Sequence, residues 1–239
     1  MDGMPHIKRF TVVTGHYGCG KTNLSINLAL DLARAQSQVT LVDLDVVNPY
    51  FRSSDSAELL VAHGVRLISP TFAGTTVDAP SLPAAVYSAF DTPGAVIFDV
   101  GGDDAGATAL GRYSAQIAAI DYELLYVINR YRNLTGTPAE AAELLAEIES
   151  VSHLKATGIV NNSHLRHETT VATVLNSIPY AEETAALLGL PLVCTTVPAG
   201  LADAFSEHPG HANHLDNAYP VQTYVRTPWE DAAPVDEED

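Results

Sequence analysis

Ten residues near the start of the chain, TGHYGCGKTN (residues 14–23), have the types and spacing of a phosphate-binding loop. Gly15, Gly20, Lys21 and Thr22 complete the pattern G-x-x-x-x-G-K-[ST]. Glycines let backbone N–H groups wrap closely around an anion, and a following helix adds the partial positive charge of its N-terminus. The lysine would reach the terminal phosphates, and the threonine hydroxyl would bind Mg²⁺. The stretch therefore predicts a site for a nucleoside triphosphate with magnesium.

A glycine-rich turn that merely joins a strand to a helix is the alternative interpretation of this stretch. The apolar run RFTVVTG before it and the helical pattern KTNLSINLALDLARAQ after it favour the nucleotide site, because they supply the strand and helix that the motif needs. Only three lysines occur in the chain, and one stands at the motif position. The residues predicted to bind the nucleotide are Gly15, Gly18, Cys19, Gly20, Lys21, Thr22, Asn23, Gly102 and Asn161.

Two carboxylates end the next apolar run, VDLD, which contains Asp43 and Asp45. Residues two apart on a strand point the same way, and open α/β sheets bind ligands at the carboxyl edge of their strands. The pair could hold magnesium-bound water or orient a nucleophile on the γ-phosphate, so Lys21, Asp43 and Asp45 are the predicted catalytic residues. The alternative is that both aspartates only cap the next loop.

The stretch IFDVGGDD gives a second carboxylate site, with Asp99 and Gly102 in D-x-x-G spacing. Asp99 would hold Mg²⁺ directly or through water, and the N–H of Gly102 would reach the γ-phosphate. The predicted metal ligands are Thr22, Asp43 and Asp99. Asp103 and Asp104 are expected to cap the following helix.

Base recognition is less defined by the sequence. Asn129, Asn161 and Asn162 stand at the ends of later apolar runs, where an amide could match the donor and acceptor edge of a purine. A turn-forming role is equally compatible with each of them. No N-K-x-D sequence occurs, so the usual guanine reader is missing and ATP is favoured.

Apolar strands alternate with helical patterns along the chain, which predicts a single-domain α/β fold with a mostly parallel central sheet flanked by helices. This P-loop NTPase fold is expected to occupy residues 1–229, with an acidic, disordered tail at 230–239. A long helical pattern, HETTVATVLNSIPYAEETAALLG, is expected to break near Pro179.

Composition narrows the classes of partner. The net charge of −17 argues against nucleic-acid binding, which usually requires a basic face. No apolar run approaches the roughly 20 residues of a membrane span, and the start MDGMPHIKRF lacks the apolar segment of a signal peptide. The expectation is a cytoplasmic protein whose partner is another protein or a small molecule.

Taken in order, these motifs resemble the MinD/ParA/CobQ (SIMIBI) class of P-loop ATPases, over the chain from roughly Phe10 to Val197. The stretches GHYGCGKT, VDLDVVNPYFR and FDVGGDDAGATALGR are similar to small bacterial CobQ/CobB/MinD/ParA nucleotide-binding-domain proteins. The resemblance implies ATP and Mg²⁺ as cofactors, bound by the glycine loop with Asp43, Asp45 and Asp99 near the metal and phosphates.

One position departs from that class. Its dimerising members carry a signature lysine in K-G-G-x-G-K-[ST], which reaches the partner's phosphates, and His16 stands in its place here. A neutral histidine supplies no full positive charge at pH 7. A homodimer driven by nucleotide therefore stays an open question, and Arg52 or Arg112 is the predicted substitute for the missing lysine.

Two functions are compatible with these residues. One is an ATPase whose nucleotide-dependent switch acts on a partner protein. The other is an ATP-dependent metabolic enzyme that activates a small carboxylate, as in dethiobiotin or cobyrinic acid diamide synthesis. Three histidines in EHPGHANH, His208, His211 and His214, have a spacing that could suit a metal, but Pro209 and Gly210 favour an irregular surface loop.

Overall fold

The computed structural model describes residues 3–35, 38–45, 56–69, 85–209 and 217–225. The boundary expected near residue 229 and the acidic tail lie outside these ranges. The described strands carry the following bounds: β1 Phe10–Gly15, β2 Val39–Asp43, β3 Val65–Ile68, β4 Ala95–Asp99, β5 Tyr122–Ile128, β6 Gly158–Asn161, β7 Leu192–Pro198 and β8 Ala218–Val221.

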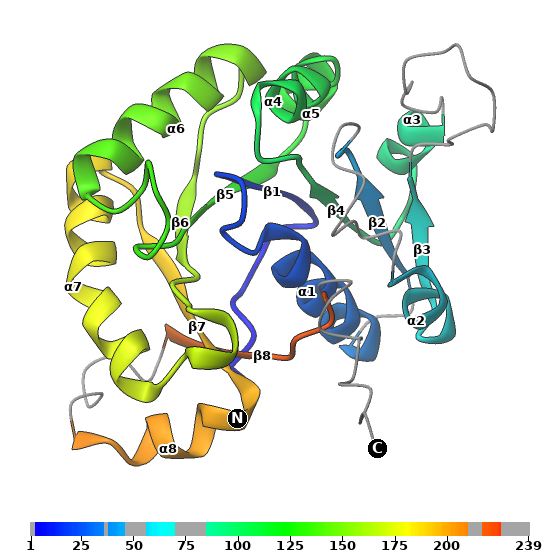
Figure 1. Ribbon diagram of the computed structural model, residues 1–239. Coiled ribbons are helices and arrows are strands. Elements are labelled where there is room, and N and C mark those ends of the chain that lie inside the picture. The colour runs from blue at the N-terminus through cyan, green and yellow to red at the C-terminus, as the bar shows by residue number, and fades with distance from the viewer. Residues whose placement is uncertain (1–2, 36–37, 46–55, 70–84, 210–216, 226–239) are drawn as a thin grey trace, which may run out of the picture.

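These strands form one eight-stranded sheet in the order β3-β2-β4-β1-β5-β6-β7-β8 (Figure 1). Every described strand pair is parallel, so the sheet is wholly parallel where a mostly parallel one was predicted. Strands β2, β3 and β4 lie on one side of β1 in the sheet, and the chain then crosses β1 to place β5 to β8 on the other side. The direction in which strands are added therefore reverses at β1. Ligands of open parallel sheets bind at the carboxyl ends of strands beside such a point, which is where the glycine loop lies.

Helices cover both faces of the sheet (Figure 1). The described helices are α1 Lys21–Ala35, α2 Ala57–Ala62, α3 Ala85–Phe90, α4 Asp104–Gly111, α5 Ser114–Ala118, α6 Pro138–Ser152, α7 Val171–Leu188 and α8 Ala202–Glu207. Core side chains of α1 and α2 pack on one face and those of α3 to α7 on the other, while α8 packs beside α7 over a smaller cluster. No helix among the described residues is long and apolar enough to cross a membrane.

Strand residues alternate between the two cores, as the pleat requires. Val12 and Val42 belong to the core under α3 to α7, whereas their neighbours Val13 and Leu41 belong to the core under α1. Because both faces are covered, the strands are continuous apolar runs rather than alternating ones. This explains why these runs could be identified as strands from the sequence.

The break predicted near Pro179 is wrong, because α7 continues through that residue. Proline removes one hydrogen bond of the helix. The residues on either side, Ile178 and Tyr180, are buried, and the Tyr180 hydroxyl donates to Thr135 O at 2.6 Å. Packing of both halves of the helix therefore outweighs the local cost of the proline.

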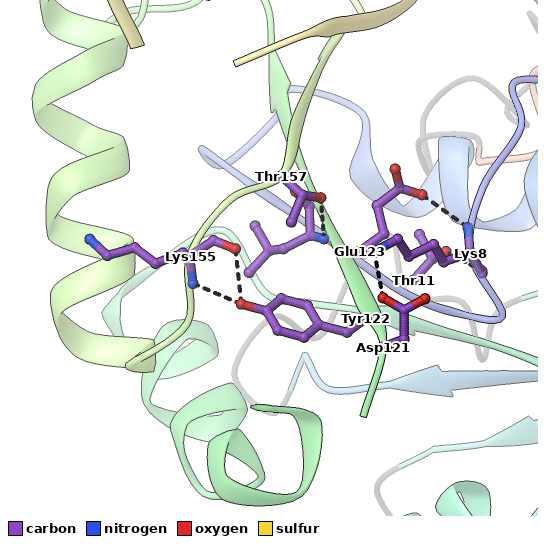
Figure 2. A network of polar contacts seen from close by, with 8 residues as sticks. Lys8, Thr11, Asp121, Tyr122, Glu123, Lys155 and Thr157 are labelled. Atoms are coloured by element: carbon purple, nitrogen blue, oxygen red, sulfur yellow. Dashed lines mark hydrogen bonds and ion pairs between the residues drawn. The ribbon is translucent and has the colours of Figure 1, made fainter. Parts of the chain in front are cut away.

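A polar network fixes the amino end of β5, at the opposite edge of the sheet from the glycine loop (Figure 2). Lys8 forms an ion pair with Asp121 at 2.6 Å, and its backbone N–H donates to Glu123 Oε2 at 3.1 Å. Tyr122 OH donates to Lys155 O at 3.2 Å. These contacts tie the chain before β1 to β5 and the chain before β6 to the same strand, so they support the register of the central strands.

Candidate functional site

The glycine loop, named here the P-loop (residues 15–22), connects β1 directly to α1. Gly15, Gly18 and Gly20 have φ values of 149°, 74° and 87°, a region that residues with a side chain rarely adopt. Lys21 is the first residue of α1 and is only 7% exposed, and its Nζ donates to His16 O at 3.0 Å. The loop thus bends back so that the ammonium group lies over its own backbone.

Two side chains from neighbouring strand ends hold the carbonyl groups of the P-loop. Arg132 Nε donates to Gly18 O at 2.9 Å, and Asn162 Nδ2 donates to Cys19 O at 2.6 Å. In a trans peptide the carbonyl and the next N–H point in opposite directions. The bond to Cys19 O therefore turns the N–H of Gly20 away from Asn162, where it can face an anion.

On its other side the P-loop meets the segment named here the switch loop (residues 99–104). A β-carbon at Gly102 would lie 2.6 Å from Lys21 Nζ and 2.6 Å from the backbone N and Cα of Tyr17. Only glycine permits this approach. The switch loop ends where Asp103 caps α4, with its side chain accepting from Gly106 N at 2.8 Å, as predicted for that residue.

The predicted carboxylates converge on the same sheet edge. Asp43 and Asp99 are register partners on β2 and β4, and both are buried. Asp43 Oδ1 accepts from Asp45 N at 3.0 Å, and a β-carbon at Gly101 would lie 3.3 Å from Asp45 Oδ1. The D-x-D and D-x-x-G segments, predicted separately, therefore lie against each other.

The oxygen groups at this edge fit a magnesium ion. Ser25 Oγ donates to Asp99 Oδ1 at 3.1 Å. Thr22 lies three residues before Ser25 on α1, so the two residues share a face of that helix. Among the described residues no group of three or more His, Cys, Asp or Glu could hold a metal by itself. Mg²⁺ in phosphate sites takes one or two protein ligands and completes its shell with phosphate and water, so Thr22 with Asp99 or Asp43 is a suitable donor set.

The side chain of Asn161 is held by polar groups of the protein. Its Nδ2 donates to Ser177 Oγ at 2.9 Å and to Thr195 Oγ1 at 3.3 Å, and its Oδ1 accepts from Ser163 N at 3.3 Å. Both amide hydrogens are used inside the protein and the side chain is fully buried. The geometry therefore argues against the predicted role of Asn161 in base recognition and gives it a structural one.

Three other candidates for nucleotide contact, Asn23, Cys19 and Asn129, also make contacts within the protein. Asn23 Nδ2 donates to Gln222 O and its Oδ1 accepts from Tyr224 N, both at 2.8 Å, so its side chain faces the segment after β8. Cys19 is fully buried inside the P-loop, and burial raises the pKa of its thiol. Its role is that of a small core residue. Asn129 accepts from Tyr131 N at 3.0 Å and donates to His164 O at 3.3 Å, which shapes the loop after β5.

His164 follows β6 and reaches the P-loop. Its Nδ1 accepts from Arg166 N at 3.2 Å, so the neutral ring carries its proton on Nε2, which lies 3.1 Å from the position of a β-carbon at Gly20. Burial, with smaller effects of Arg132 and Arg166, lowers the pKa of His164 to about 4. The ring is therefore a neutral donor directed at the P-loop at physiological pH.

Sequence reasoning did not find Arg132 or the function of His164. The signal that was available is that polar residues follow β5 and β6 directly, at the carboxyl edge where sites form. Arg112 was predicted to replace the signature lysine, but it is the C-cap of α4, at the opposite end of that helix from Gly102. Arg52 lies outside the described residues, as do His211 and His214 of the histidine loop.

Comparison with known proteins agrees with this geometry. Residues 10–187 match the family model described as the CobQ/CobB/MinD/ParA nucleotide binding domain. No curated protein matches the chain at a significant level.

Similar solved structures include the cell division protein FtsY from Thermotoga maritima, with 20% identity, a TM-score of 0.50 and coverage of 82% of this chain and 65% of that chain. FtsY from Mycoplasma mycoides has 16% identity, a TM-score of 0.55 and coverage of 82% and 63%. The 54 kDa signal recognition particle protein from Aeropyrum pernix, solved in complex with GDP, has 16% identity, a TM-score of 0.51 and coverage of 80% and 42%. At these identities the likeness shows the fold, and the chain spans less than two thirds of each of those proteins. The family match over most of the chain, on a wholly parallel sheet with a P-loop at its switch point, shows that the chain belongs to the CobQ/CobB/MinD/ParA nucleotide-binding domain family.

Proposed function

We propose that this protein is a magnesium-dependent ATPase whose switch loop changes position with the bound nucleotide and so controls a partner protein. The observation that carries the proposal is the approach of Gly102 to Lys21 Nζ and to the backbone of Tyr17. A γ-phosphate bound by Lys21 would occupy the region where these groups now meet. The switch loop would then have to move or to bind the phosphate through its own N–H groups.

Each residue of the site has a proposed part in this process. The P-loop amides and Lys21 bind and orient the phosphates, and their positive charge stabilises the charge that develops during phosphoryl transfer. Asp43 and Asp45, beside the switch loop, orient the attacking water. Bound Mg²⁺, held by Thr22 with Asp99 or Asp43, would neutralise phosphate charge.

ATP is the proposed nucleotide, since the chain has no N-K-x-D sequence. GTP is the competitor to test, because a similar solved structure was determined with GDP. A preference of the protein for GTP would overturn the choice of base and leave the phosphate site intact.

The alternative is an enzyme that activates a small carboxylate. A switch is favoured because the switch loop lies so close to Lys21 and the Tyr17 backbone that a bound γ-phosphate would have to displace or engage it. Stimulation of ATP turnover by one small carboxylic acid would nevertheless reverse this preference.

Calorimetric titration with Mg·ATP and Mg·GTP tests the proposal. The wild-type protein is expected to bind Mg·ATP, and Lys21→Met is expected to lose most of that affinity because it removes the buried ammonium. Lys8→Met is the matched control, since Lys8 lies at the opposite edge of the sheet in an exposed ion pair. Absence of binding by the wild-type protein, or equal binding by both variants, would refute the proposed nucleotide site.

Movement of the switch loop is tested by hydrogen exchange with and without a non-hydrolysable ATP analogue. We expect exchange in residues 99–104 to change on binding, while exchange in β7 stays constant. If the analogue binds and exchange in the switch loop is unaltered, the protein is not a switch of the kind proposed.

A further inference from the structure

Arg132 is a cation held against the P-loop without a carboxylate partner in the part of the chain that the structure describes. Its Nε donates to Gly18 O at 2.9 Å, and the side chain is half-buried. The ion pairs found among the described residues are Lys8–Asp121, Arg34–Asp31 and Lys155–Glu149, and Arg132 takes part in none of them. Other arginines also lack a carboxylate partner among the described residues, but they bind elsewhere: Arg66 donates to Ser88 Oγ and Arg130 to Asn176 O, whereas Arg132 donates to the P-loop.

The loop that carries Arg132 is fixed by hydrogen bonds. Thr135 Oγ1 donates to Asn129 O at 3.0 Å, and Arg132 N donates to the same oxygen at 3.1 Å. The Tyr180 hydroxyl then anchors Thr135 O to α7, and Tyr131 OH donates to Thr173 O at 2.8 Å. Because the loop is tied at several points, the guanidinium reaches the P-loop without a large loss of conformational entropy on binding a ligand.

We propose that Arg132 is a positioning residue that supplies the second positive charge of the phosphate site, beside Lys21. It fixes the P-loop through Gly18 O, and its charge stabilises the bound polyphosphate. This inference rests on the proposed nucleotide site and adds to it a second cation from the same chain.

The chemistry of the guanidinium suits this role. Arginine has five N–H donors in a rigid planar fork, and one of them is used on Gly18 O. The other four donate to no group among the described residues. The charge of Arg132 also acts on groups at the P-loop, since it contributes to lowering the pKa of His164 and counters the rise in the pKa of Cys19.

Arg130 provides the matched control. It lies two residues earlier in the same loop, is exposed, and donates through Nη1 to Asn176 O on α7. Replacing it removes the same charge from the same loop without touching the P-loop.

The experiment compares Arg132→Ala, Arg132→Gln, Arg132→Lys and Arg130→Ala by calorimetric titration with ATP, ADP and AMP in the presence of magnesium. Loss of a charged hydrogen-bonding group predicts that Arg132→Ala and Arg132→Gln bind ATP about tenfold more weakly or worse. Arg132→Lys, which keeps the charge, should recover most of this loss, and Arg130→Ala should bind as the wild type does. The weakening should be larger for ATP than for ADP and smallest for AMP, because it follows the ligand charge.

Other results would overturn the inference. If Arg132→Gln binds ATP as tightly as Arg132→Lys, or if the weakening is equal for all three nucleotides, Arg132 has only a structural role. Thermal melting of the ligand-free variants shows whether Arg132→Ala is folded. If it is not folded, the comparison of Arg132→Gln with Arg132→Lys still tests the inference. Failure of the wild-type protein to bind ATP would refute the nucleotide site itself, which is a separate outcome.

Discussion

Replacing Gly102 by alanine tests the contact between the switch loop and the P-loop. The added β-carbon would lie 2.6 Å from Tyr17 N and Cα, about 0.8 Å closer than an ordinary van der Waals contact. Lys21 Nζ, at the same distance, ends a flexible side chain and can move aside, whereas the Tyr17 backbone cannot move without distorting the P-loop. One of the two loops must therefore shift.

The loss of stability can be estimated from other proteins in which a carbon was added to a closely packed position. Forcing an extra carbon into a closely packed position destabilises a protein by about 1–3 kcal/mol. For a chain of this size each kcal/mol lowers the melting temperature by roughly 2–4 °C. We therefore expect Gly102→Ala to melt at least about 2 °C below the wild type in the absence of nucleotide.

Gly200→Ala is the control for a change from glycine to alanine. A β-carbon at Gly200 would meet no atom within 4 Å, and this residue is not among the glycines with positive φ. Its melting temperature, measured by scanning calorimetry, should stay within about 1 °C of the wild type because surface changes of this kind cost little. If Gly102→Ala melts with the wild type, or if both variants fall equally, the described contact does not restrain the two loops.

Two further predictions concern side chains that support the P-loop. Because the pKa of His164 is lowered to about 4, the unfolded chain binds a proton there as the pH falls below 6.5 and the folded protein does not, so stability is lost between pH 6.5 and about 4. Between pH 7 and pH 4.5, the free energy of unfolding measured in urea should fall by about 2.5 kcal/mol more in the wild type than in His164→Gln. The exposed control His167→Gln should show the same fall as the wild type. An equal fall in the wild type and His164→Gln would contradict the lowered pKa. Asn162→Ala removes the buried donor to Cys19 O and should lower the free energy of unfolding by about 2–3 kcal/mol, against no change for exposed Asn133→Ala. Urea midpoints that coincide for these two variants would contradict that value.

The fold could be predicted because its signals are local. Each buried strand is a short apolar run, and each long helix has its own start signal, such as the capping box of Thr137 and Glu140 at α6. The motif residues Lys21, Asp43 and Asp99 also follow from local patterns, since each stands at the carboxyl end of a strand or at the start of a helix. A parallel sheet then brings these ends together without further information.

The rest of the site depends on contacts that no local pattern encodes. Arg132 and Gly18 are 114 residues apart, and Asn162 and Cys19 are 143 apart. Asn161 and Asn162 are adjacent and identical in type, yet one is directed to α7 and β7 and the other to the P-loop, because successive residues at a strand end point in opposite directions. The sequence identified both as candidates and had no means to separate them.

The two sides of the P-loop are held differently, and under the proposed function this difference determines where nucleotide-dependent movement would occur. Arg132 and Asn162 hold one side by hydrogen bonds of 2.9 and 2.6 Å, and breaking the second would leave buried polar groups unpaired. On the other side Gly102 approaches the loop without a side chain, so separating it from Tyr17 breaks only van der Waals contacts there. A bound phosphate that competes for this space therefore displaces the switch loop at lower cost than it displaces Arg132 or Asn162. Under the proposed function, the hydrogen-bonded side is the fixed support of the phosphate site, and the glycine side is where a change from triphosphate to diphosphate would alter the surface offered to the proposed partner.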